Sequence, residues 1–304
     1  MQVCCLFQKR EENAESRGEK ALKIINLMED TKGSSECIAE HGLSFYIETE
    51  KHKLLMDTGA TENTWKNADR LGVDLTKIDT VILSHGHYDH TGGLLSFIEI
   101  NPTAKIYMQR KAGGDYYNFK EGWEKYIGID KRILELSQLQ LVDGEMKIDD
   151  ELFLFSGIVG RKHFAKSNLV LKQKVKGQFQ QDDFEHEQCL VVKQQEKYVL
   201  LSGCAHNGMI NILDRYREIY SSNPDMVISG FHLMQKEEYS EEEIRNIAEI
   251  AEELKRIEAR FYTGHCTGLP AYKIMKEIMG EQLEYVHSGD KILTIQKDDM
   301  TLVK

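Results

Sequence analysis

The first third of the chain is a series of short apolar runs separated by polar turns, a pattern that predicts β-strands. A helical segment around Trp65–Leu71 interrupts the series. The run that ends at Met56 stops at Asp57-Thr58-Gly59, which is a turn signal. The predicted strands are 21–27, 43–48, 53–56 and 80–83.

The middle of the chain is less regular and predicts strands of varied length. An aromatic cluster from Tyr116 to Tyr126 follows Gly113 and Gly114 and predicts a long, structured loop or insertion. Its side chains either pack within the core or the loop, or form a wall of a substrate pocket. The strands predicted here are 104–108, 138–142, 151–155, 168–175, 188–193 and 197–202.

The last third alternates helices and strands. A helix from Asn207 has apolar residues near helical spacing, and Asn207 is its expected cap. Ser240 and Glu243 are spaced as a capping box for the next helix. The strands predicted in this part are 226–229, 261–263, 283–286 and 291–295.

No Pro- or Ser-rich linker divides the chain, so residues 21–304 are expected to form one α/β domain. The charged residues 8–20 lack apolar periodicity and predict that residues 1–20 form a flexible or irregular arm.

The formal net charge of −11 disfavours binding to nucleic acids or anionic membranes and leaves a small molecule as the expected partner. The six cysteines contain no C-x-x-C pair and are expected to be reduced thiols. The apolar patch at 3–7 is too short for a signal peptide or a membrane helix. We therefore expect a cytoplasmic protein, whose oligomeric state the composition leaves open.

Four metal-capable side chains lie within the six residues His85-Gly86-His87-Tyr88-Asp89-His90. Imidazole nitrogens and carboxylate oxygens suit zinc and its neighbours. An apolar strand before this run and Gly92-Gly93 after it place the side chains in a tight strand-to-helix loop, where they can reach two metals. The spacing predicts a metal site, and the alternative is a surface histidine cluster that binds metal incidentally.

The segment TVILSHGHYDHTGGL at 80–94 resembles the signature of the metallo-β-lactamase superfamily. Asp57-Thr58-Gly59 resembles its first motif, and the segments 200–208 and 264–268 fall where later metal motifs should lie. The resemblance implies an α/β fold, the four-layer αββα sandwich. The downstream motifs are similar to the subgroup around dihydropterin-ribofuranosyl-aminobenzene phosphate synthase of methanogens.

The resemblance also implies roles for individual residues. It implies two metal ions, expected to be zinc with iron or manganese as alternatives, each with an open position for water. Asp57 is expected to hold the ligands in position without binding metal. The implied ligands are His85, His87 and His206 for one metal and Asp89, His90 and His265 for the other.

The third motif departs from the superfamily pattern. Many members have an Asp that bridges the metals where this chain reads Ser202-Gly203-Cys204. Either Cys204 or His206 takes over, or the bridge is missing. Cys204 is alternatively a small buried residue.

His232 and Asp89 are the expected catalytic residues. His232, in a Phe-His-Leu segment, either contacts the substrate or transfers a proton, or is a satisfied buried histidine. Arg161 is expected on a solvated face, with a substrate phosphate as its alternative partner. The histidines without a motif, expected to be structural or exposed, are His41, His52, His163, His186 and His287.

Three functions are compatible with these residues. The first is a metal-dependent hydrolase, or a related transferase, whose two metals activate water against a small phosphorylated or pterin-like metabolite. The second is a phosphodiesterase or another ester hydrolase of the same fold. The third is a non-catalytic protein that uses the metal pocket for ligand binding or sensing.

Overall fold

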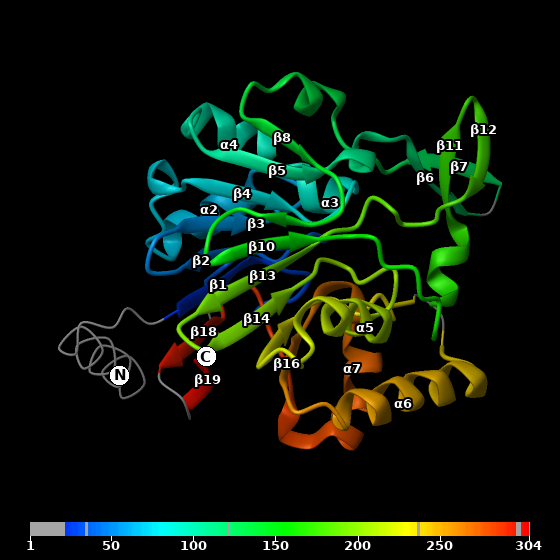
Figure 1. Ribbon diagram of the computed structural model, residues 1–304. Helices are drawn as coiled ribbons and strands as arrows, with labels where there is room; N and C mark the ends of the chain where they lie inside the picture. Colours follow the sequence, from blue (N-terminus) through cyan, green and yellow to red (C-terminus); the bar gives the residue numbers. More distant parts are fainter. Residues whose placement is uncertain (1–21, 34–35, 121, 236–237, 296–298, 304) are drawn as a thin grey trace.

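The computed structural model describes residues 22–33, 36–120, 122–235, 238–295 and 299–303, so the predicted arm at 1–20 lies outside the described residues. Two large β-sheets pack face to face, and helices cover both outer faces (Figure 1). Apolar side chains from both sheets form the central layer of the core, and each sheet packs its other face against helices. The predicted four-layer αββα sandwich is confirmed.

The first large sheet combines the N-terminal strands with the two closing strands, in the order β19-β18-β1-β2-β3-β4-β5-β8. Neighbours from β3 to β8 run parallel and the others antiparallel. Its strands are β1 (Leu22–Met28), β2 (Ser44–Glu48), β3 (Lys53–Met56), β4 (Thr80–Leu83), β5 (Lys105–Gln109), β8 (Leu139–Val142), β18 (Lys291–Ile295) and β19 (Asp299–Val303).

The second large sheet repeats this plan, in the order β17-β16-β15-β14-β13-β10-β9. Neighbours from β14 to β17 are parallel, and those from β9 to β14 are antiparallel. Its strands are β9 (Met146–Lys147), β10 (Leu152–Phe155), β13 (Cys189–Gln194), β14 (Lys197–Leu201), β15 (Met226–Ile228), β16 (Arg260–Thr263) and β17 (Leu283–Tyr285).

The helices divide between the two outer faces. Helices α2 and α4 pack on the first sheet, and α5, α6 and α7 on the second. None of the helices among the described residues has the length and apolar composition needed to span a bilayer. The helices are α2 (Asn63–Arg70), α3 (Tyr88–Thr91), α4 (Leu94–Ile100), α5 (Met209–Tyr220), α6 (Glu241–Lys255) and α7 (Leu269–Met279).

A third, four-stranded sheet stands beside the sandwich in the order β12-β11-β6-β7 (Figure 1). The aromatic cluster lies in two of its strands, so of the two predicted alternatives the structured insertion agrees with the structure and the loop does not. Tyr117 packs edge-to-face on Tyr126 of the neighbouring strand β7 and on Phe179 of β12, one strand beyond β11. Aromatic pairs of this kind stabilise the sheet. The strands are β6 (Tyr116–Lys120), β7 (Trp123–Tyr126), β11 (Leu171–Val175) and β12 (Gln178–Gln181).

Two further local predictions were wrong for identifiable reasons. The strand predicted at 168–175 begins only at Leu171, because Lys166–Val170 forms a 3₁₀ turn that directs Asn168 into the interior. Asn207 does not cap α5, whose first flanking residue is Gly208. The carboxamide of Asn207 instead bonds Glu187 and the backbone of the preceding segment.

The capping box predicted for α6 is confirmed. Ser240 accepts a hydrogen bond from the Glu243 backbone N–H, and the Glu243 carboxylate accepts one from the Ser240 N–H at 2.8 Å. Two amides that the helix cannot pair internally are thereby satisfied.

We expect Ser240→Ala to lower the free energy of unfolding by about 1 kcal/mol, because the helix loses its cap. The double variant Ser240→Ala/Glu243→Ala should lose little more, since the two side chains act as one unit. Guanidinium denaturation of the single and double variants measures both effects. Fully additive losses would contradict a reciprocal cap.

Candidate metal centre

The predicted site residues all follow the carboxyl ends of parallel strands. Asp57 follows β3, and the run from His85 to His90 follows β4, in the first sheet. Cys204 and His206 follow β14, His232 follows β15 and His265 follows β16, in the second sheet. The two parallel edges face the same region, where strand ends in α/β folds present binding groups.

One group of imidazoles brings together His85, His87 and His206. The His85 Nε2 lies 3.1 Å from His87 Nδ1, and the His206 ring centroid lies 4.9 Å and 4.8 Å from those of His85 and His87. The Nε2 atoms of His87 and His206 are buried without a hydrogen-bond partner in the described part of the chain. Unpaired buried nitrogens are costly, so this group is suited to a bound cation.

A second group contains Asp89, His90, Cys204 and His265. The His90 Nε2 lies 3.1 Å from Cys204 Sγ, and Asp89 Oδ2 lies 3.3 Å from His265 Nε2. Cys204 also belongs to a cluster with His206 and His232, whose ligand atoms lie within 4.8 Å of one another. The thiol therefore lies between the two groups.

Backbone strain marks the loops that carry these side chains. Asp57, Ala205, His232 and His265 have positive φ angles of 62°, 46°, 51° and 49°. A residue with a side chain adopts this conformation only where its surroundings impose it, and such residues concentrate at functional sites. Gly203 permits the close approach of the two sheets, because a Cβ there would lie 2.2 Å from Ser84 Oγ.

Asp57 anchors the loop that carries His85, His87, Asp89 and His90. Its carboxylate accepts hydrogen bonds from the Ser84 N–H and hydroxyl, each at 2.7 Å, and lies 2.6 Å from His90 Nδ1. It is fully buried, and its contacts orient the ligand-bearing loop. Asp57 lies behind His90 and outside the metal-donor clusters.

Glu187 and Asn168 hold the second loop. Glu187 accepts the backbone N–H of His206 at 2.8 Å and that of Asn207 at 3.1 Å. Asn168 donates to the His206 carbonyl at 2.8 Å, and its oxygen lies 3.0 Å from His206 Nδ1. An Nδ1–H donated to that oxygen would direct the free Nε2 of His206 into the site.

Glu29 and Asp30, which follow β1, hold the third loop. Glu29 accepts the His265 N–H at 2.5 Å, and Asp30 Oδ1 lies 2.5 Å from His265 Nδ1. Asp30 also bonds His41 Nδ1 at 2.8 Å, and His41 Nε2 reaches to 3.5 Å from Asp89. His41, which was predicted to be structural or exposed, is half-exposed and lines the site.

Other residues around the site carry no motif that could have revealed them. His186, predicted to be structural or exposed, is buried, accepts the Gly86 N–H at 3.1 Å and lies 3.2 Å from Asp182. Arg161 donates to Asn207 and to backbone carbonyls, so it fastens a loop. Their contacts join positions distant in sequence, and spacing alone could not reveal them.

Burial keeps the first group neutral. It lowers the pKa of His87 to about 3 and holds the pKa values of His85 and His206 well below their usual range. Burial opposes a charged His265 as well, but the hydrogen bond to Asp30 and the nearby Asp89 carboxylate raise its pKa well above the ordinary value. Neutral imidazoles are the form that binds metal.

The donor set fits a divalent metal. Neutral imidazoles, a buried carboxylate and a buried thiol converge, and the Nε2 atoms of His87, His206 and His265 lack hydrogen-bond partners among the described residues. Nitrogen and sulfur donors with few carboxylates favour zinc or a neighbouring transition metal over magnesium or calcium.

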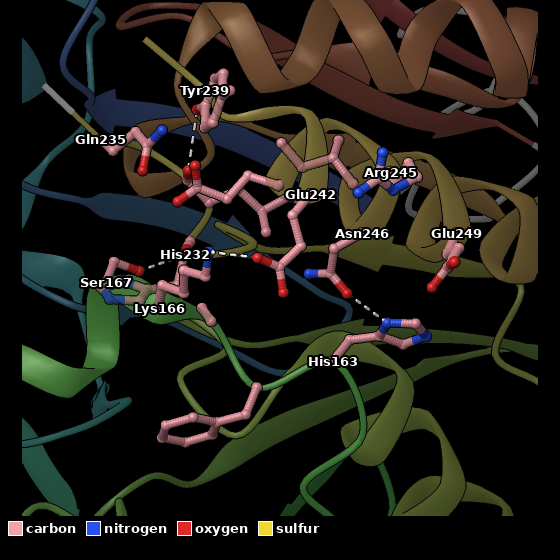
Figure 2. A pocket seen from close by; sticks show the side chains of 15 residues that line it. His163, Lys166, Ser167, His232, Gln235, Tyr239, Glu242, Arg245, Asn246 and Glu249 are labelled. Atoms are coloured by element: carbon pink, nitrogen blue, oxygen red, sulfur yellow. Dashed lines mark hydrogen bonds and ion pairs between the residues drawn. The ribbon is translucent and has the colours of Figure 1, made fainter. Parts of the chain in front are cut away.

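A cavity of about 180 Å³ opens above these side chains. A larger cavity of about 390 Å³ adjoins it, between α6 and the segment 163–167 (Figure 2). His232 lines both cavities, and its two ring nitrogens have no hydrogen-bond partner within the described residues. His163, expected to be structural or exposed, lies on the wall of the larger cavity and bonds Asn246 at 2.7 Å.

A buried cluster of nitrogen, oxygen and sulfur donors lies at the strand ends of an αββα sandwich, an arrangement typical of α/β proteins with a metal centre. The family model described as "Metallo-beta-lactamase superfamily" matches residues 38–163. A Methanocaldococcus jannaschii protein named 7,8-dihydropterin-6-methyl-4-(beta-D-ribofuranosyl)-aminobenzene-5'-phosphate synthase is 30% identical over 295 residues, which cover 88% of this chain and 95% of that protein. The chain belongs to the metallo-β-lactamase superfamily.

Two solved structures are similar over most of the chain. Tm1679, described as a metal-dependent hydrolase of the beta-lactamase superfamily, is 29% identical with a TM-score of 0.74, and the match covers 91% of this chain and all of Tm1679. YhfI from Bacillus subtilis is 14% identical with a TM-score of 0.55, over 90% of this chain and all of YhfI. The YhfI match shows the shared fold.

We expect Asn168→Ala to weaken zinc binding by roughly 10- to 100-fold, because the His206 ring loses the partner that orients it. Competition with a chromophoric chelator measures the affinity. Asn101→Ala is the matched control, since Asn101 is also buried and its carboxamide donates to the carbonyls of Leu75 and Ile78 and bonds no metal-donor residue. Equal loss of affinity in both variants would indicate a general effect of destabilisation.

We expect the free energy of unfolding of the metal-free protein to fall as the pH drops below 6.5. In this pH range His87 is protonated in the unfolded chain but stays neutral in the folded protein. The contribution of neutral His87 to the free energy of unfolding is complete above pH 6.5, and it decreases as the pH falls towards the folded pKa of about 3. His87→Gln should therefore flatten the slope by up to about 1.4 kcal/mol per pH unit. Denaturant titrations between about pH 6.5 and pH 5 measure it.

His52→Gln provides the control for this slope. Burial disfavours its charged form, but Asp149 and Asp79 raise the pKa of His52. A histidine whose pKa is raised by folding adds stability that is complete below its pKa in the unfolded chain. This stability is lost as the pH rises through its pKa in the folded protein. The acid-side slope of His52→Gln should equal that of the wild type, and an equal flattening in both variants would refute the assignment to His87.

Proposed function

We propose that this protein is a metal-dependent hydrolase, or a related transferase, that acts on a small phosphorylated or pterin-like metabolite at a dinuclear centre. The observation that carries the proposal is the convergence of the donor side chains from three loops beneath one cavity, with three imidazole nitrogens unpaired among the described residues. The names of the M. jannaschii relative and of Tm1679 support the reaction class and the type of substrate.

We assign the donors to two ions according to their grouping, with Cys204 shared between them. The expected metal is zinc, with iron or manganese as alternatives. The ligands in this assignment are His85, His87 and His206 for one ion and Asp89, His90 and His265 for the other.

A divalent metal pair, when bound, supplies a hydroxide nucleophile near neutral pH and neutralises charge on the substrate. His232 faces both cavities with unpaired ring nitrogens and is assigned to hold or transfer the proton of the leaving group. Asp89 lies within 3.5 Å of His41, His90 and His265, and is assigned the second proton-handling position at the reacting centre.

The two adjoining cavities support a substrate larger than its reacting group. The cavity above the donors accommodates a phosphate or ester group, and the larger one accommodates the remainder of the molecule. The wall of the larger cavity mixes the rings of Phe164 and Tyr239 with the amides of Gln235 and Asn246 (Figure 2). The wall also contains charged side chains, among them Lys166, Glu242 and Arg245. Rings combined with polar and charged groups suit a polar heterocyclic metabolite.

We expect about two zinc ions per wild-type chain by elemental mass spectrometry, and a loss of metal in His85→Ala and in His265→Ala. Cys204→Ala should lower the metal content towards one ion, because the thiol is the donor that adjoins both groups. His52→Ala, outside the site, is the control and should retain the wild-type content.

The same preparations test catalysis. Hydrolysis of p-nitrophenyl phosphate by the wild type, lost with the metal, supports the proposal. Cleavage of bis(p-nitrophenyl) phosphate alone would favour the phosphodiesterase alternative. Full metal loading without turnover of any ester, phosphate or lactone would contradict the proposed catalytic function and favour a non-catalytic binding protein.

A further inference from the structure

The small four-stranded sheet turns one face towards the candidate metal centre. In its register Asn118 lies opposite Lys125 on one neighbouring strand and opposite Leu171 on the other. Residues directly opposite one another share a face of an antiparallel sheet. All three line the cavity of about 180 Å³ above the metal donors, so this face forms one wall of that cavity.

The other face of the sheet is closed by its own aromatic packing. Phe179 packs on Tyr117 and Phe119, with ring centroids 5.0 Å and 4.7 Å apart. The Lys174 ammonium lies over the Tyr117 and Phe179 rings, at 5.8 Å and 4.9 Å from their centroids. The sheet therefore carries Lys125 on the face that lines the cavity and Lys174 on the opposite face.

Lys125 has no carboxylate partner in the part of the chain that the structure describes. Its ammonium lies 4.9 Å from the centre of the Tyr88 ring, which belongs to the metal-binding run. Two nearby lysines do have acidic partners, as Lys131 pairs with Asp115 and Lys111 with Glu185. A lysine left without an acidic partner in a chain of net charge −11 is available for an anionic ligand.

Asn118 adds a second unused polar group beside this ammonium. Its carboxamide oxygen is buried and has no hydrogen-bond partner among the described residues. The amide can present either its oxygen or, after rotation, its N–H groups to a ligand. Asp89 is the single Asp or Glu among the residues that line the cavity, and it is a proposed metal ligand.

We propose that Lys125 and Asn118 form an anion-recognition site that binds the phosphate group of a phosphomonoester substrate. The inference rests on the proposed function and deepens it, because it assigns the selection of a phosphorylated substrate to the small sheet. Lys125 donates charge-assisted hydrogen bonds to the phosphate oxygens, and Asn118 bonds a phosphate oxygen or its hydroxyl. Neither residue belongs to the metal-donor clusters.

The test measures binding of inorganic phosphate and of phenyl phosphate to the zinc-loaded protein by titration calorimetry. Lys125→Met should raise the Kd of both ligands about tenfold, while Lys125→Arg should stay within about threefold of the wild type. Lys174→Met is the matched control on the opposite face, and its Kd values should equal those of the wild type. Metal content and the circular dichroism spectrum should be unchanged in all three variants.

Two results would overturn the proposal. Unchanged Kd values in Lys125→Met would mean that the metals alone hold the anion. Equal weakening in Lys125→Met and Lys174→Met would mean that only the overall charge matters. A repeat on chelator-treated protein, where Lys125→Met is again expected to weaken phosphate binding and Lys174→Met is not, keeps the inference testable if the wild type holds no zinc.

The outcome stays separable from that of the proposed function. Absence of zinc from the wild type, or absence of hydrolysis by a zinc-loaded protein that still binds phosphate through Lys125, would contradict the enzyme and leave the recognition site intact. Hydrolysis by a protein whose phosphate affinity does not depend on Lys125 would contradict the recognition site and support the enzyme.

Discussion

Buried carboxylates that accept backbone N–H groups are the interactions on which the centre depends. Asp57, Glu187 and Glu29 each lie behind a different loop, and each accepts at least one main-chain hydrogen bond from it. Because these bonds fix the main chain of the loop and not only one ring, they orient several donor side chains at once.

This arrangement explains why the donors can remain close together without metal. Burial keeps His85, His87 and His206 neutral, so the imidazoles do not repel one another as cations. The pKa of His265 is raised instead, because Asp30 and Asp89 stabilise its protonated form despite burial. The two halves of the centre thus differ electrostatically: one is neutral and rich in nitrogen, and the other contains an anion and a cation.

The layers of the fold and the clustering of the candidate donors could be predicted from sequence because both leave local signals. Apolar runs mark the strands, and the spacing from His85 to His90 marks the metal loop. The residues behind the donors left no such signal. Asn168 was placed in a strand, although its contacts with His206 require the 3₁₀ turn that interrupts the strand. His41 and Glu187 reach the site only through tertiary packing, which no local pattern encodes.

Each donor group takes side chains from both large sheets. His85 and His87 follow a strand of the first sheet and His206 a strand of the second, and the other group is divided in the same way. An ion held by both sheets binds fully only when the sheets are docked, so its binding free energy is also free energy of docking. Under the proposed metal loading, metal binding is linked to assembly of the sandwich, and protein depleted of metal has weaker cohesion between its two sheets.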